Sequence, residues 1–151
     1  MRKLVISLLA VTVLGAGSAL AQSGLWAGVS AGWPGAALHF GVENVVQNLD
    51  VRANIGSSYT FNAFSVGIDA LYGLDVDLGV VPVDAYVGGG VALGIGAGLS
   101  VGIGAFGGVE YRLGDIGLPE GGVFLEVGPS FAITPAFAVG VLARLGFNYH
   151  F

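Results

Sequence analysis

The sequence contains no cysteine and very little positive charge. Among its 151 residues, five are lysine or arginine and ten are aspartate or glutamate. Without cysteine, the chain forms neither disulfides nor thiolate metal sites. Lys3 is the only lysine, and only Arg52, Arg112 and Arg144 carry a positive charge after it. This acidic balance leaves no basic surface for nucleic acid, so nucleic acid is not an expected partner.

Charged residues of either sign are scarce, and long apolar runs are missing after the first 21 residues. Only 10% of the chain is charged and 54% is hydrophobic, whereas ordinary domains carry about a quarter charged residues. Glycines and charges interrupt every later apolar run before it reaches the ~18 residues of a membrane helix. Each of the 28 glycines would also cost about 1 kcal/mol inside a helix. Only helices and closed β-barrels satisfy their backbone groups in lipid, so this composition favours a transmembrane β-barrel.

The first 21 residues have the layout of a secretory signal peptide. Met1–Lys3 is basic, Leu4–Leu14 is an apolar run, and Ala19–Ala21 has the small residues of a cleavage site. An uncleaved anchor helix is the alternative, but Gly15 and the residues after it end the run too early for a membrane span. Residues 22–151 then form a single domain.

The remaining sequence alternates between apolar residues and small or polar residues, with a period of two. The clearest case is 137–151, in which Phe137, Leu145 and Phe151 fall on one face and Arg144 falls on the other. That segment is longer than the ~25 Å apolar band of a membrane needs, so one end projects or the strand begins after Phe137. Eight such segments are expected, at 25–33, 36–42, 49–55, 64–72, 81–91, 101–111, 123–127 and 137–151. An even number is typical of single-chain outer-membrane barrels.

The phase of the alternation predicts the connections, because a loop with an odd number of residues preserves parity and one with an even number reverses it. Parity reverses at Pro34-Gly35, which predicts a tight turn or, alternatively, a four-residue loop. It is preserved within Gly94–Gly98, which predicts an odd loop, and at Thr134-Pro135-Ala136, which predicts a three-residue turn. Longer connections are expected at Glu43–Asn48, Gly73–Val80 and Leu113–Gly122.

Charged residues inside the segments all have the parity opposite to the apolar face. If the apolar face meets lipid, these residues point into the lumen and form a charge network there, composed of Asp50, Arg52, Asp69, Asp84, Glu110, Arg112, Glu126 and Arg144. An eight-stranded barrel is so narrow that side chains fill it. A plugged lumen held by ion pairs is therefore expected, and a gated ion path through the same pairs is the alternative. Lumen glycines such as Gly88 and Gly108 either leave a water-filled gap or admit a tightly curved wall.

No catalytic, cofactor or metal site is expected. The two histidines, His39 and His150, have no metal-pair spacing and fit lumen or rim positions better than ligand positions. The glycine-rich run before Gly104 is not followed by the Lys-Ser/Thr of a phosphate loop.

The signal peptide, the eight segments and the terminal Leu145-x-Phe147-x-Tyr149-x-Phe151 resemble the small eight-stranded outer-membrane β-barrels of Gram-negative bacteria. That broad class includes the barrel domain of outer-membrane protein A. The resemblance implies an all-β, antiparallel up-and-down barrel in contact with outer-membrane lipid. It also implies that Leu145, Phe147, Tyr149 and Phe151 form the signal read by the outer-membrane assembly machinery. Interfacial aromatic residues are expected among Trp26, Trp33, Tyr59, Tyr72, Tyr111 and Tyr149.

Three functions follow from these observations. The first is a non-enzymatic outer-membrane barrel with a plugged lumen and a structural role in the cell envelope. The second is a narrow pore for small solutes, which differs only in having a continuous lumen. The third is a soluble periplasmic barrel holding an apolar ligand, which the scarcity of charge disfavours. The sequence specifies neither a solute nor an oligomeric state.

Overall fold

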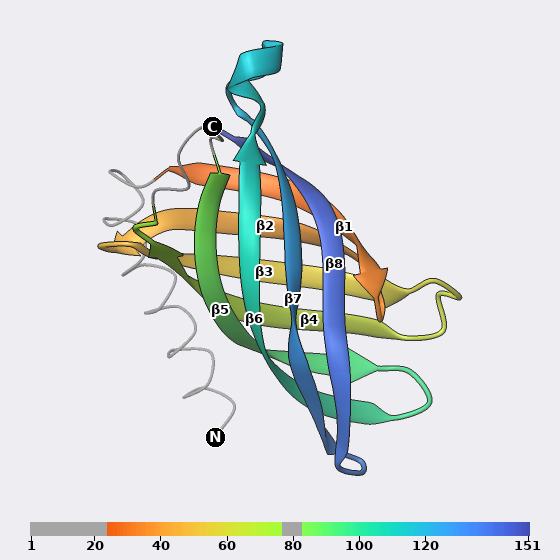
Figure 1. Ribbon diagram of the computed structural model, residues 1–151. Helices are drawn as coiled ribbons and strands as arrows, with labels where there is room; N and C mark the ends of the chain where they lie inside the picture. The colour runs from red at the N-terminus through yellow and green to blue at the C-terminus, as the bar shows by residue number, and fades with distance from the viewer. Residues whose placement is uncertain (1–23, 77–82) are drawn as a thin grey trace, which may run out of the picture.

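The chain folds into one closed barrel of antiparallel strands (Figure 1). The computed structural model describes residues 24–76 and 83–151, and eight strands and one short helix lie in these ranges. They are β1 (Leu25–Trp33), β2 (Gly35–Val46), β3 (Leu49–Ser58), β4 (Phe64–Leu74), β5 (Val83–Ile95), β6 (Leu99–Arg112), the 3-10 helix η1 (Leu113–Ile116), β7 (Gly121–Thr134) and β8 (Ala138–His150).

Each strand pairs with its neighbours in the sequence, and β1 pairs with β8 to close the barrel. In Figure 1, β5 to β8 cross in front of β1 to β4, as expected for tilted strands on opposite walls. The prediction of an all-β, antiparallel up-and-down barrel of eight strands is confirmed. The predicted signal peptide, 1–21, and Val81 of the expected fifth segment lie outside the described residues. In the described ranges, no helix has the length and apolar character needed to cross a membrane.

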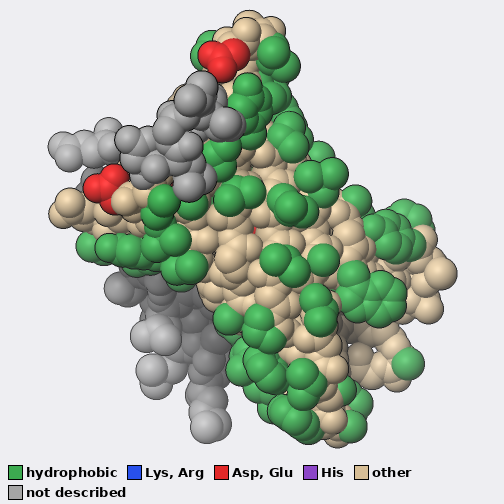
Figure 2. Space-filling model, viewed as in Figure 1, with side chains coloured by type: hydrophobic (Ala, Val, Ile, Leu, Met, Phe, Trp, Pro, Cys, Tyr) green, Lys and Arg blue, Asp and Glu red, His purple; other side chains and the backbone are tan. Residues whose placement is uncertain are grey.

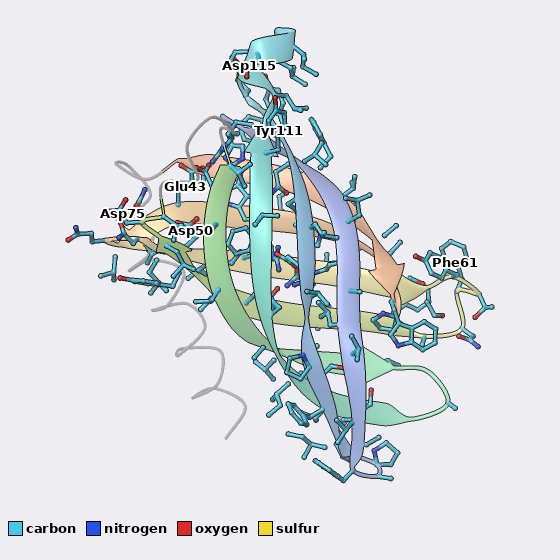
Figure 3. All side chains as sticks on the ribbon, viewed as in Figure 1. Glu43, Asp50, Phe61, Asp75, Tyr111 and Asp115 are labelled. Atoms are coloured by element: carbon cyan, nitrogen blue, oxygen red, sulfur yellow. The ribbon has the colours of Figure 1, made fainter. Side chains whose placement is uncertain are left out.

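The two ends of the barrel differ in character. We call the end at which β1 begins and β8 ends the terminal end; it also carries the β2–β3, β4–β5 and β6–β7 connections. We call the opposite end the turn end, because its four connections are all short. Glu43, Asp50 and Asp75 lie at the terminal end and Phe61 lies at the turn end (Figure 3). The acidic residues labelled in Figure 3 therefore all lie at the terminal end.

Of the strands that extend beyond their predicted limits, β2 and β7 do so furthest. The expected connection Glu43–Asn48 is wrong, because β2 continues to Val46 and only Gln47 and Asn48 form the turn. The pairing of β2 with β3 shifts register between Val42 and Val46, and this irregularity admits polar residues that break the alternation. The expected segment 123–127 is too short, since the ladder of β7 with β8 runs on to Ala132.

The connections at the turn end follow the predicted parity. Ile95 pairs with Leu99, so three residues form the β5–β6 loop and the prediction of an odd loop is confirmed. Ala31 pairs with Ala36, which makes the first connection the four-residue alternative and not a two-residue turn. The last strand begins at Ala138, so it starts after Phe137.

Bulky lumen-facing side chains lie over glycines of the adjacent strand. In each pair, a Cβ on the glycine would collide with the ring of its cross-strand partner. The pairs are Trp26 with Gly41, Tyr86 with Gly108, Phe106 with Gly88 and Phe124 with Gly146. These glycines therefore make room for aromatic rings in a barrel too narrow to hold two large side chains at the same level.

Candidate functional site: the barrel lumen

All aspartate, glutamate and arginine residues within the eight described strands have lumen-facing positions, and the outward positions are apolar. The outer wall exposes large hydrophobic side chains, including Leu38, Phe40, Ile68 and Leu125, each more than half exposed. On the face in Figure 2, hydrophobic side chains are spread along the barrel, and acidic ones stand out only at the terminal end. The aspartate, glutamate and arginine side chains of the strands are therefore confined to the lumen and the terminal rim.

Four charged residues meet near the middle of the lumen, and we call them the central ion cluster: Arg52, Asp69, Glu126 and Arg144. Arg52 Nη2 lies 2.7 Å from Asp69 Oδ2, and Arg52 Nη1 lies 2.7 Å from Glu126 Oε1. Arg144 Nη2 lies 3.1 Å from the same oxygen of Asp69, and Arg144 Nε donates to Glu126 Oε2. Two cations and two anions are thus joined in one balanced group.

The central ion cluster crosses the barrel from wall to wall. Arg52 is on β3 and Glu126 is on β7, and these strands are four apart in a ring of eight. Arg144 on β8 and Asp69 on β4 are also four strands apart. Each of these ion pairs therefore joins opposite walls, so the cluster braces the barrel across its width.

Aromatic and polar side chains enclose the cluster. The Arg52 guanidinium lies 5.4 Å from the centre of the Phe106 ring, and that of Arg144 lies 4.9 Å from the same ring, both within the range of cation–π attraction. The Tyr86 hydroxyl donates to Glu126 Oε1 at 2.8 Å. Asn54 Nδ2 donates to Asp69 Oδ2 at 2.9 Å. The carboxylates therefore accept several hydrogen bonds in addition to their ion pairs.

Because the central ion cluster is buried, each of its charges depends on the others for compensation. The side chains of Arg52 and Glu126 are 0% exposed. A charge removed from water costs several kcal/mol unless opposite charge and hydrogen bonds compensate for it. Because each cluster member contacts both residues of opposite charge, removal of any one leaves its partners under-compensated.

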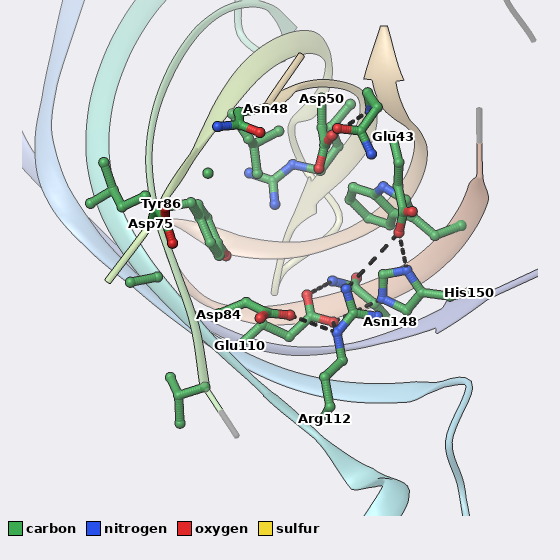
Figure 4. Close-up of a pocket in the computed structure, with 18 of the residues that line it drawn as sticks. Glu43, Asn48, Asp50, Asp75, Asp84, Tyr86, Glu110, Arg112, Asn148 and His150 are labelled. Atoms are coloured by element: carbon green, nitrogen blue, oxygen red, sulfur yellow. Dashed lines mark hydrogen bonds and ion pairs between the residues drawn. The ribbon is translucent and has the colours of Figure 1, made fainter. Parts of the chain in front are cut away.

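A second charged group lies at the terminal end (Figure 4). We call it the rim cluster: Glu43, Asp84, Glu110, Arg112 and His150. Arg112 Nε lies 2.9 Å from Asp84 Oδ2 and 3.5 Å from Glu110 Oε1. The Asp84 side chain is 62% exposed, so this ion pair is weakened by solvent.

His150 holds together three strands at this rim. Its Nδ1 lies 2.6 Å from Glu43 Oε1 on β2, and its Nε2 lies 2.8 Å from Glu110 Oε1 on β6. A carboxylate oxygen only accepts hydrogen bonds, so both ring nitrogens donate and the imidazole carries a positive charge. His150 therefore ties the end of β8 to two other strands close to the β1–β8 seam.

A polar cavity of about 590 Å³ occupies the terminal half of the lumen and is lined by the rim cluster. Arg52 also lines this cavity, so the space reaches down to the central ion cluster. Trp26 forms part of its wall and is 4% exposed. The expectation that Trp26 belongs to an interfacial girdle is therefore wrong: its even position places it on the lumen face of β1.

The eight residues expected in the lumen network fall into separate groups. Arg52, Asp69, Glu126 and Arg144 form the central ion cluster, and Asp84, Glu110 and Arg112 belong to the rim cluster. Asp50 contacts neither group through an ion pair among the described residues and accepts a hydrogen bond from the backbone of Asn44 at 2.7 Å.

Several polar lumen residues were absent from the expected network. Tyr86, Asn54 and Glu43 contact its members, and Asn148 Nδ2 donates to Glu110 Oε2 at 2.7 Å. All four have lumen parity, and that signal identifies the three uncharged residues once uncharged side chains are included. Glu43 was assigned to a connection because the end of β2 breaks the alternation.

His39 is fully buried and contacts neither a metal-binding group nor a carboxylate. Its Nδ1 lies 2.6 Å from Asn54 Oδ1, and its Nε2 lies 2.8 Å from Ser30 Oγ. Within residues 24–76 and 83–151, no group of three or more histidine, aspartate or glutamate side chains has the arrangement of a metal site. The His39 ring is therefore held in the lumen by two uncharged hydrogen-bond partners.

No protein-family model matches the sequence, and a comparison with curated proteins finds no significant match. Two solved structures are similar. Neisserial surface protein A is 17% identical, with 85% of this chain and 94% of that chain covered and a TM-score of 0.53. The N-terminal β-barrel domain of Pseudomonas aeruginosa OprF is 13% identical, with 85% and 96% covered and a TM-score of 0.54. Both likenesses show the fold, and the expected structural resemblance to small eight-stranded barrels is confirmed.

Proposed function

We propose that this protein is an integral barrel of the bacterial outer membrane, with a closed lumen and a structural role in the cell envelope. The observation that carries the proposal is the sorting of the strands: apolar side chains cover the outer wall, and every charged residue of the described strands has a lumen-facing position. An outward arginine at the membrane midplane would cost ~2–4 kcal/mol. Both similar solved structures are eight-stranded outer-membrane barrels.

Aromatic residues bracket the apolar wall at both ends. Tyr72 and Tyr149 are outward-facing near the terminal ends of β4 and β8, and both are partly or largely exposed. Trp33, Phe61 and Phe137 are exposed at the turn end. Aromatic rings prefer the level of the lipid headgroups, so two such bands fit the two interfaces of a membrane. This arrangement supports a membrane-spanning orientation of the barrel axis.

The central ion cluster supports a closed lumen. Its two wall-to-wall ion pairs occupy the middle of the barrel, and Phe106 and Phe124 lie against Arg52 within 6 Å of its guanidinium. A solute passing through would have to separate these buried ion pairs, which is costly because each separated charge loses its main compensation. We therefore assign the cluster a bracing role.

A narrow pore is the second candidate, because open space approaches the cluster from both sides. Arg52 lines the terminal cavity, and Asp69 and Arg144 line a second cavity at the turn end. The central ion cluster therefore lies between the two cavities. In this version, the ion pairs exchange partners and gate the path.

Planar-bilayer recording distinguishes the two candidates. Because the ion pairs close the lumen, the purified barrel is expected to insert without discrete conductance steps. A porin recorded in the same bilayers verifies their sensitivity, and heat-modifiable migration on a gel verifies that the barrel is folded. Regular conductance steps whose size changes in the Arg144→Ala variant would contradict the closed lumen and favour a pore through it.

The membrane location has its own test. Cells extracted with alkaline carbonate are expected to retain the protein in the membrane fraction, because its apolar wall is in contact with lipid. Recovery in the soluble fraction would contradict the membrane assignment and favour the periplasmic barrel.

We also propose that the outward residues near the end of β8 act as a signal for the outer-membrane assembly machinery. Leu145, Tyr149 and Phe151 are exposed on the outer wall. The Phe151 and Tyr149 rings pack edge to face, with their centres 5.3 Å apart. Phe151→Ala removes little buried surface, since Phe151 is 77% exposed. We expect it to reduce assembled barrel in cells strongly and to change the stability of barrel refolded in detergent by less than about 0.5 kcal/mol. Equal losses in the two assays would leave Phe151 as an interface anchor only.

A further inference from the structure

The turn-end half of the lumen encloses a second cavity, of about 880 Å³. We call it the turn-end chamber. Its mouth lies among the short connections, next to Pro34, Gly96–Gly98 and Pro135, and its floor consists of Phe106, Asp69 and Arg144. It therefore lies on the opposite side of the central ion cluster from the polar terminal cavity.

The chamber exists because its wall residues are small. In the terminal half, rings such as Trp26 and Tyr86 fill the space above facing glycines. In the turn-end half, most lumen positions carry glycine, alanine or serine instead, with Ala92 on β5 and Ser130 on β7 as examples, and Asn54 and Leu142 are larger. The Cβ of Ala92 approaches the position of a Cβ on Gly67 at 3.3 Å, which places both on the lumen face. The small side chains therefore leave open space in this half of the lumen.

The walls of the chamber are also uncharged. Among its lining residues in the described part of the chain, only Asp69 and Arg144 carry a charge, and they face each other at the floor at 3.1 Å. The rim is apolar, with Trp33 68% exposed and Leu99 64% exposed. A charged ligand would lose its hydration in the chamber and gain no counter-charge above the floor, which is costly.

Serine hydroxyls supply the polar groups on the walls. Ser65, Ser100 and Ser130 line the chamber, each on a different strand. A Cβ on Gly56 would lie 2.7 Å from Ser65 Oγ, and one on Gly140 would lie 3.0 Å from Ser130 Oγ, so these hydroxyls face the lumen. A hydroxyl both donates and accepts, and it pairs with an uncharged polar group without a large desolvation cost.

We propose that the turn-end chamber binds an uncharged, mainly apolar small molecule that enters from the turn end. The volume lies within the range of ~300–1,000 Å³ typical of small-molecule sites, which are likewise mostly apolar with a few placed polar groups. The lining selects against ions and accommodates a single neutral polar group at the serine hydroxyls. The proposal depends on the barrel fold alone and holds whether or not the lumen conducts.

Two nearly isosteric dyes test the proposed selectivity. N-phenyl-1-naphthylamine is neutral, and 8-anilino-1-naphthalenesulfonate adds one sulfonate to a similar aromatic frame. In the Trp26→Phe background, Trp33 is the only remaining tryptophan of the full chain and lies at the chamber mouth, so energy transfer from Trp33 reports a dye bound nearby. We expect saturable, one-to-one transfer to the neutral dye and binding of the anionic dye weaker by about tenfold or more.

Matched variants separate the chamber from the surrounding detergent. Ala92→Phe fills the chamber, and Leu93→Phe places the same ring one residue away on the outer wall, where Leu93 is 46% exposed and does not line the chamber. Ser130→Leu fills the chamber from another strand if Ala92→Phe does not fold. We expect the filling variants to weaken neutral-dye binding by about tenfold and Leu93→Phe to leave it unchanged.

Three results would overturn the proposal: transfer that never saturates, equal binding in the filling variant and in Leu93→Phe, or anionic-dye binding as tight as that of the neutral dye. The bilayer and carbonate experiments on the proposed function have separate readouts, so failure of one proposal does not imply failure of the other.

Discussion

Glu126→Ala is expected to lower the free energy of unfolding of the barrel by about 3–5 kcal/mol, the loss typical of breaking a buried ion pair. The Glu126 carboxylate accepts from Arg52, Arg144 and the Tyr86 hydroxyl and is 0% exposed. Its removal leaves two cations with Asp69 as the only anion of the central ion cluster. Urea unfolding in lipid vesicles, followed by tryptophan fluorescence, measures the loss.

Two further variants assign this loss to the buried charge. Glu126→Gln keeps the size and most hydrogen-bonding atoms of the side chain, so a large part of the loss should persist if charge balance dominates. Asp84→Ala also breaks an ion pair with an arginine, but the Asp84 side chain is 62% exposed, and a loss below about 1 kcal/mol is expected. Similar losses for Asp84→Ala and Glu126→Ala would show that the central ion cluster does not brace the barrel.

The direction of each lumen charge could be predicted from sequence because strand parity is a local property. Arg52, Asp69 and Glu126 each lie opposite in parity to the apolar residues of their own segments, and each is buried in the lumen. Every strand of the barrel separates the same two environments, so the alternation alone identifies the face. The loop of Gly96–Gly98 followed from the same parity rule.

The pairing of the charges could not be predicted, because it depends on the stagger of strands far apart in sequence. Arg52 and Glu126 are 74 residues apart, and Asp69 and Arg144 are 75 apart. Parity places all of these side chains inside but does not set their heights along the barrel axis. The division into a central cluster and a rim cluster therefore required the register of all eight strands.

The role of the lumen glycines also could not be predicted from the alternation within a single strand. Glycine and a large aromatic residue face each other across neighbouring strands, as in Phe106 opposite Gly88. Parity marks both as lumen positions, and only the cross-strand register shows that one accommodates the other. The small size of most lumen side chains in the turn-end half, which opens the chamber, is recognised from the same register.

The glycine pairing predicts a large difference between two adjacent substitutions on β6. Gly108 faces the lumen, where a Cβ would lie 2.5 Å from the Tyr86 ring, whereas a Cβ on Gly107 meets nothing within 4 Å. Gly108→Val is expected to lower the free energy of unfolding by about 1–3 kcal/mol through overpacking. Gly107→Val places a β-branched side chain on the outer wall of a strand and should cost nothing or stabilise the barrel.

A double-mutant cycle with Tyr86→Ala tests whether the Tyr86 ring is the cause of the Gly108→Val loss. Tyr86→Ala alone removes the hydroxyl that donates to Glu126, so it carries a cost of its own. If the ring and the valine compete for one space, the double variant should be more stable than the sum of the single losses by about 0.5–3 kcal/mol. Strict additivity would mean that Gly108 is required by the backbone of β6 and not by the ring above it.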